Sequence, residues 1–186
     1  KIYDTAARIY PNDYRTWNNL GVVQYETGDY KAAQANFQKA LSLNANCAEA
    51  KMNMGLISVL DKDLTKANQY FGQAAGADGL NDALGIYYLK MGDNASAARA
   101  FGDSKTNNAA LAQILTKDYS KAKNTLAAIS KPDATTYYLM AVLGARTNNE
   151  SMVTSNLKKA VSLDPSMAKL AAEDLEFANF NVSSIK

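Results

Sequence analysis

Residues 14–47 read YRTWNNLGVVQYETGDYKAAQANFQKALSLNANC, and the interpretation of the whole chain starts from this stretch. Apolar residues recur at helical spacing on both sides of Gly28-Asp29, a pair typical of a turn. Gly21 allows a second helix to approach closely, and Phe37 lies one helical turn after Ala33 on the same face. The stretch therefore predicts a hairpin of two packed helices.

The same pattern returns along nearly the whole chain, which indicates a series of repeats. A small residue of the first helix recurs as Gly21, Gly55, Gly85, Ala110 and Ala141. The alanine of the second helix recurs as Ala33, Ala67, Ala97 and Ala122, and becomes Val153 in the last copy. Four residues later comes a large apolar residue, which is Phe37, Phe71, Phe101, Leu126 or Leu157. Since no hairpin can bury its apolar seam alone, stacked neighbours are expected to complete the core.

Each turn within a hairpin ends in Asp or Asn, a residue type that caps helices by accepting free backbone N–H groups. These expected caps of the second helices are Asp29, Asp63, Asp93, Asp118 and Asn149.

The first complete copy resembles the tetratricopeptide repeat (TPR) family, whose pattern runs W-x2-L-G-x2-Y, then A-x3-F, then P. Trp17, Leu20-Gly21 and Phe37 carry the resemblance, while Gln24 and Ala45 depart from the family's Tyr and Pro. The resemblance implies an all-α fold, namely a right-handed superhelical α-solenoid of about five TPR-like helical hairpins with a C-terminal capping helix.

The repeats also predict how the chain is divided. The expected parts are residues 1–13 as the end of a truncated repeat, 14–47 as TPR 1, 48–77 as TPR 2, 78–102 as a short TPR-like unit 3, 103–133 as TPR-like unit 4, 134–167 as TPR 5, 168–180 as the capping helix and 181–186 as a tail. Shortened helices are expected in 78–102, because so short a unit leaves little room for turns. Leu170, Ala171 and Leu175 lie at helical spacing, which predicts an amphipathic helix at the end of the stack.

Composition argues against several kinds of partner. Lys and Arg number 20 and Asp and Glu 18, for a formal net charge of +2, and both signs are scattered along the chain. No basic surface for nucleic acid is therefore predicted. The apolar runs fall far short of the ~20 residues that cross a bilayer, so direct membrane insertion of this segment is not expected.

The sequence lacks the side chain on which most common hydrolase designs depend. The chain has no histidine, which excludes Ser-His-Asp triads, Cys-His pairs and zinc sites that contain histidine. Cys47 is the single cysteine, and is interpreted as a small, partly buried residue near a helix start. Residues 78–82 contain two aspartates, but they lack the twelve-residue frame of a calcium loop. We therefore predict no enzymatic activity, no cofactor and no metal.

The TPR resemblance implies that the first helices of successive hairpins line a concave groove. Residues at and around the position after the small Gly or Ala would face it, and the predicted partner-binding residues are Asn18, Val22, Tyr25, Met52, Leu56, Val59, Ile86, Leu89, Leu111 and Tyr138. Their apolar character is typical of a surface that takes an amphipathic helix or an extended peptide. Equally, tight curvature of the stack would bury these side chains against one another. Because no Lys or Arg stands among the first-repeat and second-repeat positions, a carboxylate-binding clamp is not expected.

The function that these features favour is a non-enzymatic protein-interaction scaffold that binds a peptide or partner helix of unknown identity. The alternative is a structural spacer or self-association module of a larger bacterial envelope protein. A bias toward Ala, Asn, Ser, Thr and Tyr is similar to that of repeat domains of bacterial envelope proteins, which favours the bacterial periplasm or cell envelope.

Overall fold

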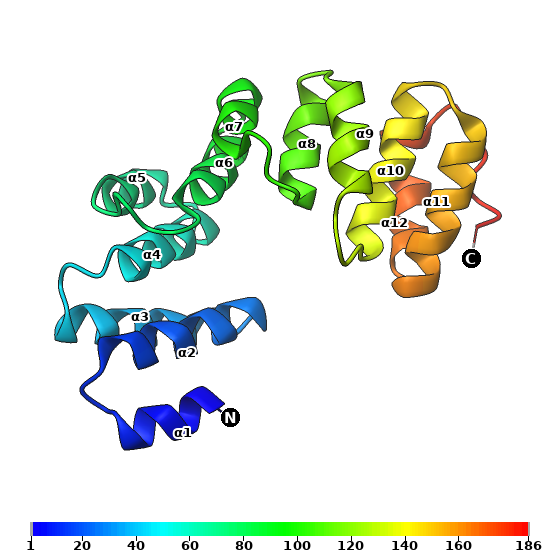
Figure 1. Ribbon diagram of the computed structural model, residues 1–186. Helices are drawn as coiled ribbons and strands as arrows, with labels where there is room; N and C mark the ends of the chain where they lie inside the picture. Colours follow the sequence, from blue (N-terminus) through cyan, green and yellow to red (C-terminus); the bar gives the residue numbers. More distant parts are fainter. Residues whose placement is uncertain (1, 186) are drawn as a thin grey trace. The chain divides into compact units, whose positions relative to one another are not determined.

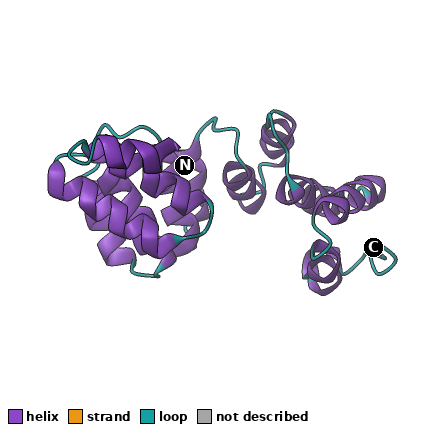
Figure 2. Cartoon of the chain, turned by 90° about the horizontal axis from the view of Figure 1, so that it is seen from below, coloured by secondary structure: helices purple, strands orange, loops and turns teal. Residues whose placement is uncertain are grey.

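The computed structural model describes residues 2–185, and all regular secondary structure in that range is helical, as Figure 1 and Figure 2 show. The chain divides into two compact units, with the boundary between Gly92 and Asp93. Within each unit, consecutive helices pack as hairpins. The predicted all-α fold of stacked helical hairpins is therefore confirmed.

Unit 1 is built from helices that pack on their neighbours in chain order. Its elements are α1 (Ile2–Ile9), α2 (Tyr14–Glu26), α3 (Tyr30–Leu43), α4 (Ala48–Leu60), α5 (Leu64–Gly72) and α6 (Leu80–Met91). α2 pairs with α3, and α4 pairs with α5. In addition, α4 contacts α2, α3 and α6, so the first helices α2, α4 and α6 form a row.

Unit 2 repeats this arrangement and ends in two short helices. Its elements are α7 (Asn94–Phe101), α8 (Asn107–Leu115), α9 (Tyr119–Ala127), α10 (Ala134–Arg146), α11 (Glu150–Leu163), α12 (Met167–Glu173) and the 3-10 helix η1 (Leu175–Phe177). α8 pairs with α9 and α10 with α11, while α12 packs on α11 and η1 on α10. Of the two helices in the region 78–102, α7 is short with 8 residues, whereas α6 has 12 residues and is not shortened.

The turns that precede the capping residues share one backbone geometry. The residue before each cap has a positive φ, and these residues are Gly28, Lys62, Gly92, Lys117 and Asn148. The next side chain then caps the second helix, for example Asp63 Oδ1 accepting from Lys66 N at 3.0 Å and Asn149 Oδ1 from Met152 N at 3.1 Å. The caps predicted at Asp29, Asp93 and Asp118 are formed as well.

Each complete hairpin is closed by its small residue and its large apolar residue. A Cβ atom on Gly21 would lie 2.5 Å from Phe37 Cε1, and one on Gly55 would lie 2.5 Å from Phe71 Cε1. Unit 2 has Ala110 in place of the glycine, and there the partner is the smaller Leu126; both are fully buried in its core cluster. The side-chain pair thus fixes how closely the two helices approach.

The predicted capping segment is helical in two pieces rather than in one. Asp174 has an extended backbone, with φ −82° and ψ 122°, and it ends α12 at Glu173. Its carboxylate accepts hydrogen bonds from Glu176 N at 2.9 Å and from the Tyr138 hydroxyl at 2.5 Å. These two bonds are made by a side chain outside α12, which accounts for the break.

Candidate functional site

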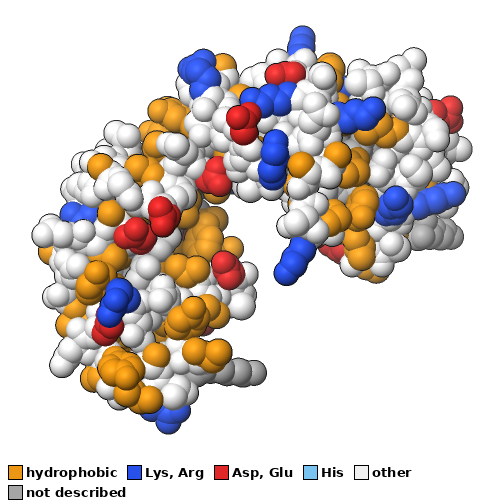
Figure 3. Space-filling model, in the orientation of Figure 1, with side chains coloured by type: hydrophobic (Ala, Val, Ile, Leu, Met, Phe, Trp, Pro, Cys, Tyr) orange, Lys and Arg blue, Asp and Glu red, His pale blue; other side chains and the backbone are white. Residues whose placement is uncertain are grey.

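Five of the predicted groove residues form an apolar strip on the first helices of unit 1. We define the apolar strip as Val22, Met52, Leu56, Ile86 and Leu89. All five are half-buried, so each keeps part of its surface accessible. In Figure 3, hydrophobic side chains gather over unit 1, in the region where Figure 1 draws α2 and α4. The strip thus combines a packed base with an accessible apolar surface.

The base of the strip belongs to the hydrophobic core. Met52, Leu56 and Ile86 pack against one buried cluster that contains Val59 and Phe71. Val59 is only 2% exposed, so this predicted groove residue lies in the core rather than on the surface. Because the base is packed, the accessible part of the strip is held in a fixed position.

Asn18 and Tyr25, two further predicted groove residues, are largely engaged inside unit 1. Asn53 Nδ2 donates to Asn18 Oδ1 at 3.1 Å, a buried bond that joins α4 to α2. The Tyr25 ring meets Tyr30 edge-to-face at 5.4 Å, and burial raises the pKa of Tyr25. Asn18 therefore helps to fix the register of neighbouring hairpins, whereas Tyr25 stays half-buried beside Val22.

Acidic side chains flank the apolar strip. Glu49 stands three residues before Met52, Asp82 four before Ile86 and Glu26 four after Val22, so each shares a helix face with the strip. One lysine, Lys90, stands four residues after Ile86. Arg15 near the start of α2 is held by Asp13 at 2.8 Å, which lowers the pKa of the Asp13 carboxyl. The strip is thus bordered by more negative than positive charge.

The two groove residues predicted in unit 2 are both packed. Leu111 lies half-buried against the core cluster of that unit. Tyr138 is 8% exposed, and its ring meets Phe177 edge-to-face at 5.6 Å. Its hydroxyl donates to Asp174, so burial and this hydrogen bond raise the pKa of Tyr138. In unit 2, the chain's own residues 174–177 therefore cover the position that the sequence assigned to a partner.

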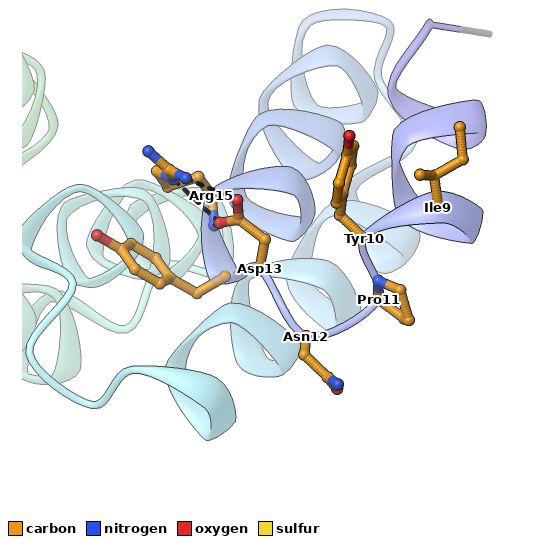
Figure 4. Close-up of a pocket in the computed structure, with 7 residues that line it drawn as sticks. Ile9, Tyr10, Pro11, Asn12, Asp13 and Arg15 are labelled. Atoms are coloured by element: carbon orange, nitrogen blue, oxygen red, sulfur yellow. Dashed lines mark hydrogen bonds and ion pairs between the residues drawn. The ribbon is translucent and has the colours of Figure 1, made fainter.

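A shallow cavity of about 550 Å³ lies at the link between α1 and α2, and no sequence pattern predicted it. Figure 4 shows Ile9 and Tyr10 on one side and the Arg15–Asp13 ion pair on the other. All of its lining residues come from the single stretch 9–15, so it is a depression beside one turn. It forms because Trp17 Nε1 donates to Pro11 O at 2.8 Å and folds the link against α2.

The part of the chain that the structure describes offers neither a metal site nor a membrane span. Within 2–185, no group of three His, Cys, Asp or Glu side chains is placed to hold a metal ion. Over the same range, no helix is both long and apolar enough to pass through a membrane. The carboxyls of Asp13 and Asp93 have lowered pKa values because they accept hydrogen bonds from Arg15 and Ser96, which are contacts at helix starts.

Comparison with known proteins agrees with this architecture. The family model described as tetratricopeptide repeat matches residues 14–47. A solved TPR protein from Parabacteroides merdae superposes with a TM-score of 0.67 at 16% identity, covering 90% of this chain and 73% of the other. YrrB, described as a TPR protein with an unusual peptide-binding site, superposes with a TM-score of 0.55 at 21% identity, covering 94% and 99%. The fold is that of a TPR α-solenoid, and residues 14–47 match the tetratricopeptide repeat family.

Two bacterial relatives are similar over part of the sequence. Cellulose synthase 1 operon protein C of Komagataeibacter xylinus is 30% identical over 112 residues, which is 60% of this chain and 8% of that protein. Type IV pilus assembly protein PilF of Pseudomonas aeruginosa is 28% identical over 97 residues, which is 50% of this chain and 38% of PilF. The chain thus spans well under half the length of either relative.

Proposed function

We propose that the protein is a non-enzymatic interaction scaffold whose apolar strip binds an amphipathic or extended peptide segment of a partner protein. TPR proteins generally mediate protein–protein interactions, and their fold is typically a non-catalytic scaffold. The observation that carries the proposal is the half-buried apolar strip on α2, α4 and α6. An accessible apolar surface on a packed base is what a helix or peptide needs as a docking site.

The charges around the strip define the chemistry of the partner. Glu26, Glu49 and Asp82 border it against the single Lys90. A segment with apolar side chains for the strip and Lys or Arg on its flanks would match both features. The description of YrrB as a protein with a peptide-binding site supports this type of ligand for the fold.

The test is a binding titration of two model peptides, one an amphipathic Leu/Lys helix and the other its Leu/Glu counterpart, by fluorescence anisotropy. The Leu/Lys peptide should bind the unaltered chain, and Leu56→Asp should weaken binding about tenfold or more, because a lost apolar contact of ~1.5 kcal/mol has that effect. Leu43→Asp is the matched control, since Leu43 is an exposed leucine at the end of α3.

Equal affinities of the two peptides, or of the Leu56→Asp and Leu43→Asp chains, would contradict the proposal. Circular dichroism of each variant checks that the helices are retained. A result in which neither peptide binds would likewise count against the strip.

One observation favours a second function, a spacer or self-association module. On α1, Ile2 is 81% exposed and Ile9 61% exposed, so this helix leaves apolar side chains accessible at its surface. Sedimentation of the unaltered chain beside Ile2→Lys/Ile9→Lys would reveal association through α1. A monomer in both cases would remove self-association; a pure spacer should be monomeric and should bind neither model peptide.

A location at a bacterial cell envelope forms part of the proposal. Its support is the similarity to a type IV pilus assembly protein and to a cellulose synthase operon protein. Fractionation of cells that carry the tagged full-length protein tests it, and recovery with cytosolic markers would contradict it.

A further inference from the structure

The residues Asp174, Leu175, Glu176 and Phe177, here called the DLEF segment, lie against α10 of unit 2. Tyr138 and Arg146 of α10 contact this segment. We propose that this face of α10 is a binding site for acidic–aromatic peptides of the pattern Asp-x-Glu-aromatic, and that the DLEF segment occupies the site as an internal ligand. The proposal concerns unit 2 and does not rest on the apolar strip of unit 1.

An arginine with two kinds of contact anchors the acidic side chain. Arg146 donates to Glu176 through Nε at 3.1 Å and through a terminal nitrogen at 2.6 Å. Its other terminal nitrogen donates to the Ile114 carbonyl of α8 at 3.3 Å. Because a guanidinium matches a carboxylate with paired, directional bonds, this arrangement selects Glu or Asp at this place.

Tyr138 contributes the second half of the site. Its hydroxyl donates to Asp174 Oδ2 at 2.5 Å, and its ring packs edge-to-face on Phe177. Phe177 is 2% exposed and belongs to the core cluster of unit 2. An acidic and an aromatic side chain are thus recognised together, three positions apart.

The remaining residue of the segment makes no use of the site. Leu175 is 88% exposed, so it points away from α10. Any residue would serve at that position, which is why the pattern contains an unspecified residue. The contacts that the segment makes therefore define which residues the site selects in a peptide.

The outer face of this end of the stack is mixed. It exposes Lys169 and Glu173 but also Leu170 and Leu175, whereas a cap of a repeat stack needs only polar side chains there. The side chains of Arg146 and Glu176 are 25% and 30% exposed, so both charges lose part of their hydration when the pair forms. Because this loss offsets much of the attraction between the charges, the pair contributes more to specificity than to the free energy of folding. The break at Asp174 also separates the segment from α12 along the chain.

The experiment uses the full chain and an acetylated, amidated peptide with the sequence of residues 173–180, EDLEFANF. In the unaltered chain, the internal segment competes at an effective concentration of about millimolar, so the peptide binds weakly. Glu176→Arg in the chain repels Arg146 and frees the site. This variant should bind the peptide about tenfold or more tightly than the unaltered chain does.

A charge exchange provides the control. The Arg146→Glu chain should not bind the EDLEFANF peptide, and should bind the same peptide with Glu176→Arg. Absence of binding to the Glu176→Arg chain, or equal binding of both peptides by both chains, would overturn the proposal. If the unaltered chain forms dimers by exchanging the DLEF segment, the ligand of the site is a second copy of this chain, and the proposal of a foreign peptide is wrong.

A measurement on the unaltered chain tests the proposal even if one of the variants fails to fold. Hydrogen exchange at the amides of Glu176 and Phe177 should become faster in excess EDLEFANF peptide, because the peptide displaces the segment. The charge-reversed peptide should leave their exchange unchanged. If the EDLEFANF peptide also leaves it unchanged, the site does not exchange its ligand and the proposal is wrong.

Discussion

Unit 1 and unit 2 build the same type of hairpin from different side-chain pairs. In unit 1, glycine faces phenylalanine, as in Gly55 and Phe71, whereas in unit 2 alanine replaces the glycine and leucine replaces the phenylalanine, as in Ala141 and Leu157. The volume lost on one helix is thus restored on the other. We therefore expect the spacing between the two helices of a hairpin to depend on the pair and not on either residue alone.

The units also differ in what covers their first helices. In unit 1 the apolar strip stays half-buried, while in unit 2 Tyr138 and Arg146 are covered by the DLEF segment. Equivalent positions on the first helices of the repeats are therefore accessible and apolar in unit 1, whereas in unit 2 they contact the DLEF segment. The difference arises from a segment outside the repeat pattern, and not from the repeats themselves.

The largest expected effect is on the free energy of unfolding, and it tests whether the two units unfold independently. Phe71→Ala should lower the free energy of unfolding by about 3–5 kcal/mol, since it empties a buried aromatic site. Trp17, the single tryptophan, lies in unit 1, so urea unfolding followed by its fluorescence reports on that unit. Leu126→Ala in unit 2 should shift the circular dichroism transition while largely sparing the fluorescence transition. Equal shifts of the fluorescence transition would show that the chain unfolds as one unit.

A smaller effect tests the pairing itself. Gly55→Ala places a methyl group 2.5 Å from Phe71 Cε1, and overpacking of this kind costs about 1–3 kcal/mol. Adding Phe71→Leu converts the pair to the type found in unit 2, and should recover a large part of the loss in a double-mutant cycle of urea unfolding. Additive losses would mean that the two positions do not act as a pair.

The smallest effect concerns the turns. Lys62 has a φ of 60°, a backbone region that costs residues other than glycine about 1 kcal/mol. Lys62→Gly should therefore raise the midpoint of thermal unfolding slightly. Lys62→Ala removes the same side chain but keeps the strain, so it should bring no such gain. A similar rise in both variants would assign the effect to the lysine side chain instead.

The fold could be predicted because the repeat pattern depends only on the spacing of residues that are close together in the sequence. Ala33 and Phe37, one helical turn apart, must share a face, and the turn pairs such as Lys62-Asp63 specify a cap wherever they occur. Neither inference needs knowledge of residues far away in the chain. The repeat pattern and the hairpin turns were therefore predicted correctly.

The candidate site was harder to predict because it depends on contacts between hairpins. The spacing that puts Val59 on the predicted wall does not reveal that Phe71 and Tyr87 bury it. Similarly, the helical spacing of Leu170, Ala171 and Leu175 concealed the break at Asp174, after which Phe177 covers Tyr138. An Asp that can cap the backbone two residues on, as Asp174 does for Glu176, was the one local sign of that break.

The buried bond between Asn53 and Asn18 has a consequence for how such a protein can change during evolution. It joins the side chains of two successive hairpins, so neither amide is satisfied by its own repeat. Duplication or exchange of the first hairpin would strand one amide in an apolar setting unless the incoming neighbour offered a matching partner. After a gene rearrangement, only hairpins that carry matching amides at these two positions should be stable as neighbours.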